Sequence, residues 1–243
     1  MRTNLRILFV LMLGMAVVSC QDMNRSAEQD VAQQEKVGTV LTSEEQKALT
    51  PDDVLNNLKE GNERYVADDI TPRDLPSQVK ATTGGQFPQA VVLSCIDSRV
   101  PVEYVLDQGV GDIFVARVAG NFVNQDIIGS MEYGCKVAGS KLIVVLGHES
   151  CGAVKAAIDN VELGNITPML ANIKPAVQKS QDFEGEKTSK NHDFVTHVCK
   201  NNVHLTIEDI RERSPILKEM EDNGEIRIVG AFYEMDSGKV VFL

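Results

Sequence analysis

The sequence predicts an α/β fold with a parallel β-sheet core flanked by helices. Three short apolar runs, at residues 89–94, 113–117 and 141–147, have the composition of strands that are buried on both faces. A helical pattern at residues 127–138 lies between the second run and the third. Apolar strands that alternate with helices favour a parallel sheet, because the connecting helices then cover both of its faces.

The beginning of the chain is predicted to be a lipoprotein-type signal peptide, residues 1–19. Two arginines precede an apolar run at residues 7–18, which is too short to span a bilayer but suits the core of a signal peptide. The run ends in VVSC, which resembles a bacterial lipobox in which Cys20 becomes the lipidated first residue. The alternative is an ordinary cleaved signal in which Cys20 is incidental.

Residues 20–48 are predicted to comprise the lipidated cysteine and a flexible tether, because they are rich in polar residues and poor in apolar ones. The protein is therefore expected to be exported, periplasmic and lipid-anchored to a bacterial membrane. The chain of 243 residues carries a net charge of −11. Without a basic stripe it is a poor ligand for nucleic acids or anionic lipids, so we expect membrane contact only through Cys20.

Residues 49–243 are predicted to form the folded domain, which begins with a helix. Thr50 is a suitable N-cap, Pro51 suits the first helical position, and two aspartates follow near the positive end of the helix dipole. Further helices are expected at residues 152–163, 168–179 and 193–213, and two closing strands at residues 225–234 and 239–243, joined by a turn at residues 236–238.

Two short motifs place metal-binding side chains at the ends of predicted strands. Cys95 directly follows the first strand, and His148 directly follows the third, with Cys151 three residues later. The carboxyl ends of parallel strands meet at one edge of a sheet, so these side chains should lie together. With the carboxylate of Asp97 they form a full ligand set for tetrahedral zinc. Arg99 could compete with the metal for Asp97, which predicts a fourth position that can open, as in catalytic sites.

Four segments of the chain carry a resemblance to a known family: CIDSRVPVE (95–103), FVARVAGN (114–121), SMEYG (130–134) and GHESCGAV (147–154). They are similar to segments of the β-class carbonic anhydrases, and the resemblance runs from about Thr50 to the C-terminus. It implies an α/β fold with a parallel sheet and one Zn²⁺ per subunit. It also implies reversible hydration of CO₂ to bicarbonate and a proton, so residues 49–243 would be a zinc-dependent β-carbonic anhydrase domain.

The resemblance assigns roles to individual residues. Cys95, His148 and Cys151 match the three zinc ligands of the family, and Asp97 and Arg99 match its catalytic dyad. Held by Arg99, Asp97 is expected to orient the zinc-bound nucleophile by accepting its hydrogen bond. Released from Arg99, Asp97 could become the fourth zinc ligand and close the site.

The resemblance also identifies a substrate pocket. Gln86 matches a glutamine that binds substrate in one branch of the family, and Phe114 and Tyr133 match aromatic pocket positions of that branch. Some of these residues come from the neighbouring subunit there, which implies a homodimer or tetramer. Ala119 stands where some relatives carry valine, which leaves the size of the pocket open but not the chemistry.

Three alternatives remain open from the sequence. The first is a closed structural zinc site, since four protein ligands normally indicate one. The second keeps the fold and the metal but acts on carbon disulfide or carbonyl sulfide. The third is a catalytically inactive zinc protein that senses bicarbonate.

The remaining cysteines and histidines are expected to have no metal-binding role. Cys135 and Cys199 are predicted to be buried free thiols within helices. The histidines at positions 192, 197 and 204 lack a compact ligand spacing and are expected to be solvated or to pack against neighbours. Because an exported protein meets oxidants, we expect metal-free protein to form a Cys95–Cys151 disulfide or a sulfenate.

Overall fold

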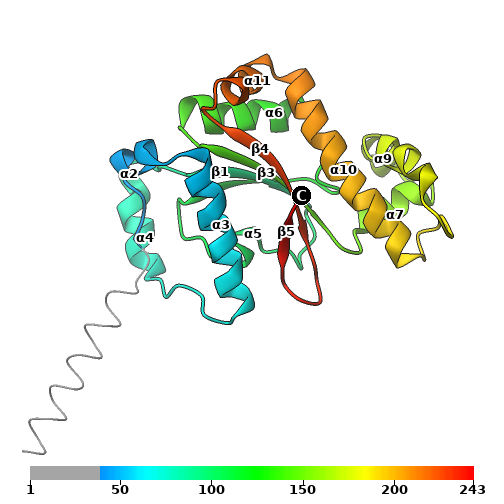
Figure 1. Cartoon of the computed structure of the whole chain (residues 1–243), viewed down its shortest axis with the longest axis horizontal. Helices are drawn as coiled ribbons and strands as arrows, with labels where there is room; N and C mark the ends of the chain where they lie inside the picture. Colours follow the sequence, from blue (N-terminus) through cyan, green and yellow to red (C-terminus); the bar gives the residue numbers. More distant parts are fainter. Residues whose placement is uncertain (1–38) are drawn as a thin grey trace, which may run out of the picture. The chain divides into compact units, whose positions relative to one another are not determined.

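The computed structural model describes residues 39–243, and the account below concerns the unit formed by residues 39–70 and 75–243 (Figure 1). The predicted signal peptide and Cys20 lie outside the described residues. The elements are α2 (Ser43–Ala48), α3 (Pro51–Val66), α4 (Leu75–Ala81), η1 (Thr82–Gly84), β1 (Ala90–Ser94), α5 (Val102–Val105), β2 (Ile113–Arg117), α6 (Gln125–Glu132), the π-helix η2 (Tyr133–Val137), β3 (Leu142–His148), α7 (Gly152–Ile158), α8 (Ile166–Leu170), α9 (Lys174–Lys179), η3 (Ser180–Asp182), α10 (His192–Arg213), α11 (Pro215–Asp222), β4 (Arg227–Tyr233) and β5 (Val240–Phe242).

The strands form one sheet in the order β2-β1-β3-β4-β5. The first four strands are parallel, and β5 pairs antiparallel with β4. The predicted parallel core and the closing pair of strands are therefore confirmed. Ser94, the last residue of β1, is in register with Leu146 of β3. This register brings the residue that follows β1 beside the end of β3, where the predicted metal ligands lie.

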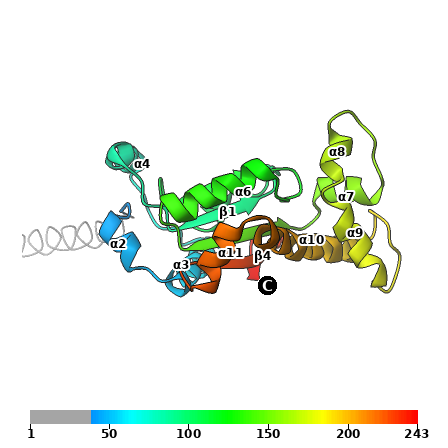
Figure 2. The same cartoon turned by 90° about the horizontal axis from the view of Figure 1, so that it is seen from above.

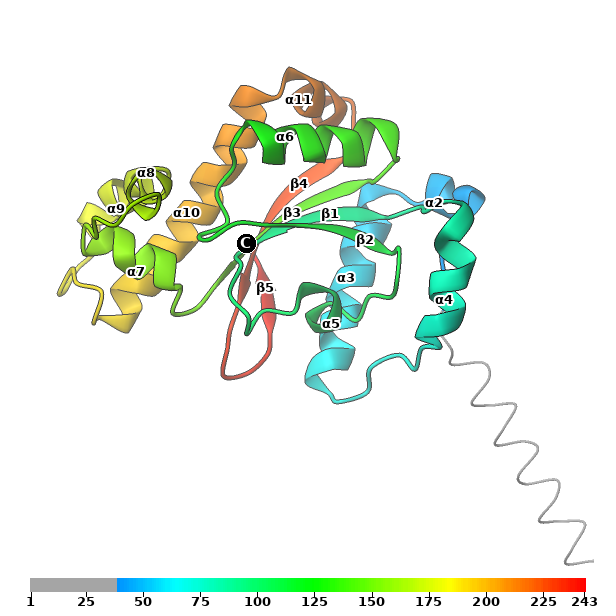
Figure 3. The same ribbon diagram turned by 180° about the vertical axis from the view of Figure 1, so that it is seen from behind.

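Helices cover both faces of the sheet because successive strand residues point to opposite sides. Val91 of β1 and Ile143 of β3 join one core, which α6, η2, α10 and α11 cover. Val92 and Val144 join a second core on the other face, under α3 and α5. The views from the two sides agree, with α3 in front of the strands in Figure 1 and behind them in Figure 3. This burial explains why β1 and β3 read as continuous apolar runs.

A third core lies beyond the carboxyl edge of the sheet. Helices α7, α8 and α9 gather beside the end of α10 (Figure 2). Their apolar side chains pack around Phe194 of α10, and Cys95 and Cys151 belong to the same cluster. The two thiols are thus held between the sheet and a helical group.

The first predicted helix is confirmed in detail. Thr50 caps α3 by accepting a hydrogen bond from the backbone of Asp53, and the Asp53 side chain accepts one from the backbone of Thr50. Pro51 occupies the first turn, where its missing N–H costs no hydrogen bond. No helix in the described part of the chain is long and apolar enough to cross a bilayer.

The predicted tether is wrong over its last residues. The structure has a helix, α2, at Ser43–Ala48, capped by Thr42 and Glu45. Gln46 of this helix is buried and donates hydrogen bonds to the carbonyls of Pro88 and Ala138, both at 2.8 Å. A polar composition hid this docking, because the contact depends on amide hydrogen bonds rather than on an apolar face.

The predicted middle helices are shorter or divided. The helix expected at residues 152–163 ends at Ile158, and Asn160 then takes a left-handed φ of 53°. The helix expected at residues 168–179 is two helices, α8 and α9. The helix expected at residues 127–138 closes with a π-helical turn. The helical periodicity of apolar residues locates these segments, but it does not locate the turns that interrupt them.

Candidate metal centre

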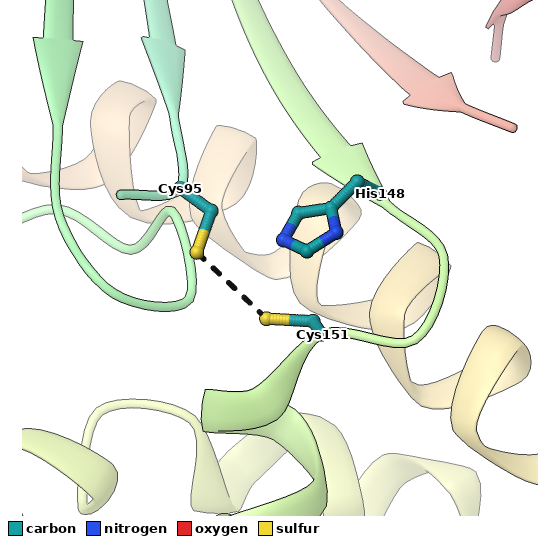
Figure 4. Close-up of side chains that lie close together, drawn as sticks. All are labelled: Cys95, His148 and Cys151. Carbon is teal, nitrogen blue, oxygen red and sulfur yellow. Dashed lines mark hydrogen bonds between the residues drawn. The ribbon is translucent and has the colours of Figure 1, made fainter. Parts of the chain in front are cut away.

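Three side chains from two segments of the chain converge at the carboxyl edge of the sheet. Cys95 follows β1, His148 is the last residue of β3, and Cys151 is the N-cap residue of α7. Their donor atoms lie within 4.8 Å of one another, and all three residues are buried. Figure 4 shows the two sulfurs facing each other beside the imidazole ring. The convergence that the positions of these residues at the strand ends predicted is therefore present in the structure.

A sharp turn lets His148 and Cys151 face the same point. Ser150 adopts a left-handed φ of 53°, which is uncommon for a residue other than glycine. The chain thus reverses between the end of β3 and the start of α7. Such backbone conformations persist where the surrounding structure enforces them, and they are frequent at functional sites.

The imidazole of His148 is held in one tautomer. Its Nδ1 lies 2.8 Å from the carbonyl oxygen of Glu149, and a carbonyl can only accept a hydrogen bond. Nδ1 therefore carries the proton, and Nε2 presents a lone pair. Within residues 39–243, this buried Nε2 has no hydrogen-bond partner. Burying a hydrogen-bond acceptor without a partner costs free energy unless a cation binds to it. His148 therefore has the properties of a metal ligand.

The two thiols form an asymmetric pair. The sulfur atoms of Cys95 and Cys151 lie 3.9 Å apart, and the backbone N–H of Gly120 donates to the Cys95 sulfur at 3.3 Å. The pKa of Cys95 is lowered, chiefly because Cys151 donates a hydrogen bond to it; burial acts in the opposite direction, and the Gly120 amide lowers the pKa further. The same pairing with Cys95, together with burial, raises the pKa of Cys151. The first thiolate therefore forms readily, whereas the second needs a cation nearby.

The donor set fits a zinc ion. Two thiolates and a neutral imidazole are preferred zinc ligands and balance its charge. Two Zn–S bonds of about 2.3 Å at a tetrahedral angle span roughly 3.8 Å between the sulfurs. The observed separation of 3.9 Å matches that span. The residues present therefore suit a tetrahedral ion with three protein ligands and one further position.

Asp97 lies next to the three ligands but is held by Arg99. The guanidinium donates from Nε to Oδ1 at 2.9 Å and from Nη2 to Oδ2 at 2.8 Å, and the Arg99 amide donates to Oδ1 at 3.0 Å. These bonds lower the pKa of Asp97 to about 2. Asp97 Oδ2 is 3.9 Å from His148 Nε2, so the carboxylate borders the site. The pairing of Asp97 with Arg99 that the sequence predicted is present in the structure.

Arg117 is a supporting residue to which the sequence analysis assigned no role. It ends β2 and donates from Nε to the Cys95 carbonyl at 2.8 Å and from Nη2 to the Asp97 carbonyl at 2.6 Å. Both ends of the Cys95–Asp97 segment are thereby tied to the neighbouring strand. A charged residue that ends an otherwise apolar strand was the available signal.

The three predicted pocket residues do not join the metal ligands within this chain. Gln86 is exposed in the loop before β1, at the end of that strand opposite Cys95. Phe114 is in register with Val91 near the start of β1, and its ring meets that of Tyr133 edge-on at 6.2 Å. The Tyr133 side is open, since this residue is 54% exposed. A pocket around the metal therefore cannot be assembled from these residues in one copy of the chain.

The remaining thiols behave as expected from the sequence. Cys135 and Cys199 are buried and free, and burial raises the pKa of each to about 12. His197 packs against the ring of Phe183 and meets Asn201. Among the described residues, the only cluster of three metal-binding groups is that of Cys95, His148 and Cys151.

The fold and the site together define a class of protein, an α/β domain whose parallel sheet carries a compact Cys–His–Cys donor set at its carboxyl edge. The sequence model of the carbonic anhydrase family matches residues 90–240. Carbonic anhydrase 2 of Mycobacterium tuberculosis is 37% identical over 192 residues, which cover 76% of this chain and 88% of that protein. The carbonic anhydrase of Mycolicibacterium smegmatis is 34% identical over 197 residues, covering 75% and 88%. The chain belongs to the carbonic anhydrase family.

Solved structures identify the fold within that family. The β-carbonic anhydrase CcaA superposes with a TM-score of 0.62 at 22% identity, covering 78% of this chain and 92% of that one. A tetrameric β-carbonic anhydrase of Sordaria macrospora gives 0.62 at 23% identity, covering 78% and 93%. The predicted β-carbonic anhydrase fold is therefore confirmed.

Proposed function

We propose that this protein catalyses the reversible hydration of CO₂ to bicarbonate and a proton, with one Zn²⁺ per subunit bound by Cys95, His148 and Cys151. One observation carries the proposal: the three donor atoms converge in a buried site, where Nε2 of His148 has no hydrogen-bond partner among residues 39–243. Membership of the carbonic anhydrase family supports the substrate.

When bound, zinc supplies the Lewis acidity that makes water a nucleophile near neutral pH. The chain supplies the orientation. Asp97 stays ionised because Arg99 holds it, and its Oδ2 lies 3.9 Å from Nε2 of His148. Asp97 can therefore accept a hydrogen bond from the attacking nucleophile, and this bond would orient the lone pair of the nucleophile towards CO₂.

The Asp97–Arg99 pair supports an open catalytic site over a closed structural one. A closed site would need Asp97 as the fourth ligand, but both of its oxygens are engaged by Arg99. A structural role would leave no use for an arginine so close to the metal ligands. The closed arrangement becomes accessible when Arg99 is lost.

The substrate pocket is proposed to form between two copies of the chain. Gln86, Phe114 and Tyr133 would come from a neighbouring subunit, since none of them joins the ligands of its own chain. A homodimer or tetramer follows, and the similar protein of Sordaria macrospora is described as tetrameric.

We further propose that the protein is exported, periplasmic and lipid-anchored through Cys20. The signal-like run at residues 7–18 and the lipobox-like ending support this location. The anchor would place CO₂ hydration outside the cytoplasm, at a bacterial membrane.

Metal analysis combined with stopped-flow CO₂ hydration tests the proposed function. We expect about one zinc per wild-type chain, and loss of both zinc and activity in Cys151→Ala. Cys135→Ala is the matched control, because it removes another buried free thiol that lies outside the cluster. Wild-type protein without stoichiometric metal would refute the proposal. If the protein releases sulfide from carbon disulfide or carbonyl sulfide and does not hydrate CO₂, the proposed substrate is wrong and the proposed zinc site stands.

A further inference from the structure

A buried asparagine of α10 is linked to a metal-binding sulfur through a single glycine. Asn202 is 2% exposed, and its Nδ2 donates to the carbonyl of Gly120 at 2.8 Å. The N–H of the same Gly120 donates to the sulfur of Cys95 at 3.3 Å. One residue thus connects the helix, on its carbonyl side, to the proposed zinc ligand, on its amide side.

The turn that carries Gly120 needs support from outside. Gly120 has a φ of 85° and Asn121 a φ of 40°, so two consecutive residues lie in the left-handed region, which is uncommon for residues other than glycine. Thr206, one helical turn beyond Asn202, donates to the carbonyl of Asn121 at 3.4 Å. A Cβ at Gly120 would lie 2.3 Å from Cδ1 of Ile173, so a glycine is required there. The helix and the packing together hold this turn in its conformation.

The same helix contacts the strand that carries His148. A Cβ at Gly147 would lie 2.7 Å from Cγ2 of Val203 and 3.7 Å from the carbonyl oxygen of Cys199. The backbone of α10 therefore lies close against the residue that precedes His148. One helix supports both the turn behind Cys95 and the strand end that presents the imidazole.

We propose that Asn202 is a positioning residue of the metal centre, which aims the Gly120 N–H at the Cys95 sulfur by holding the Gly120 carbonyl. The amide donor stabilises negative charge on the sulfur, and outer hydrogen bonds of this kind tune metal affinity. Asn202 contacts the turn behind Cys95, and Val203 contacts the residue before His148. Helix α10 thereby also fixes the position of Cys95 relative to His148. The inference rests on the proposed zinc-binding function.

Metal affinity measures this role independently of catalysis. The variants are Asn202→Ala and the milder Thr206→Val, compared with wild type by zinc competition against a chromophoric chelator. Asn201→Ala is the matched control, because Asn201 is the adjacent residue of the same type and bonds instead to Ser180 and His197. We expect Asn202→Ala to weaken zinc binding about 10-fold, Thr206→Val to act in the same direction by less, and the control to leave affinity unchanged.

Cobalt substitution gives a second readout that a general loss of stability would not move. Loss of an N–H donor to a thiolate makes the sulfur a better electron donor, so the sulfur-to-Co²⁺ charge-transfer band should shift to lower energy in Asn202→Ala. The band of Asn201→Ala should match wild type.

The outcomes separate this inference from the proposed function. If wild type binds zinc and both Asn202→Ala and Thr206→Val bind it equally well, the inference is overturned and the proposed function stands. An equal loss in Asn201→Ala also overturns it, because the effect would then belong to the helix as a whole. If Asn202→Ala does not fold, Thr206→Val decides. Wild-type protein without metal overturns the proposed function, and this inference with it.

Discussion

The two ends of the parallel strands differ in how much of a functional site one chain assembles there. At the carboxyl edge, Cys95, His148 and Cys151 converge within one chain and are buried and supported by hydrogen bonds. Toward the amino edge, Gln86 is exposed, and Tyr133 presents an open aromatic surface. A single chain therefore builds the proposed metal centre, whereas the substrate pocket that we propose would need a second copy. The difference separates metal binding from substrate binding, and mutations at the two edges should separate them too.

The largest expected effect is metal removal, which acts on the carboxyl edge alone. Chelation should abolish CO₂ hydration, and added Zn²⁺ should restore it.

Oxidation of the metal-free protein should form a disulfide. Hydrogen peroxide should join the sulfurs of Cys95 and Cys151, with two thiols and one peroxide giving a disulfide and two water molecules. Thiol titration and mass spectrometry measure this. Free thiols after oxidation of metal-free protein would contradict the prediction, and zinc-loaded protein is the control.

The next largest effect is expected for Arg99→Ala. Without the guanidinium, Asp97 loses its two side-chain hydrogen bonds and becomes free to ligate zinc. We expect a loss of about 100-fold in kcat/KM, as small displacements of a catalytic group can cause, with zinc content unchanged. A crystal structure should show Asp97 as the fourth ligand. Water on zinc with Asp97 remote would contradict the closed state.

A complementation experiment tests whether the pocket comes from a second copy. Gln86→Ala should reduce kcat/KM about 10-fold, the size of one lost hydrogen bond, while zinc binding is retained. Mixed with Cys151→Ala under subunit exchange, it should regain activity. Each heterodimer then has one complete site, with zinc from one chain and Gln86 from the other. No gain on mixing, with heterodimers present by mass spectrometry, would place Gln86 in its own chain's site or outside the pocket.

The smallest effect is expected where α2 docks near the amino edge. Gln46→Ala removes the hydrogen bonds to Pro88 and Ala138 and leaves a buried and a partly buried carbonyl with fewer partners. The free energy of unfolding should fall by about 1–3 kcal/mol, with kcat/KM per folded molecule unchanged. Denaturant unfolding measures this, with the exposed Glu44→Ala as the control. Unchanged stability would mean that α2 is no part of the folded domain.

Some features could be predicted from the sequence because they depend on local chemistry. The apolar runs of β1 and β3 reflect burial on both faces, and Thr50 and Pro51 are sufficient to start α3. The metal ligands could be predicted because Cys95 follows β1, His148 ends β3 with Cys151 three residues later, and parallel strands end at a common edge. The hydrogen bonds of Arg117 and Asn202 could not, since each side chain donates to a backbone carbonyl that is distant in the sequence.

By itself, the sequence determined the α/β class, the strand ends and the Cys–His–Cys donor set, because periodicity and residue chemistry are properties of short segments. Only the tertiary structure decided the tautomer of His148, the capture of Asp97 by Arg99, the docking of α2, and the separation of Gln86 and Tyr133 from the metal ligands. These depend on hydrogen bonds and packing between segments that are distant in the chain or on the exact path of a loop. Such contacts leave no repeating pattern in the residues that make them.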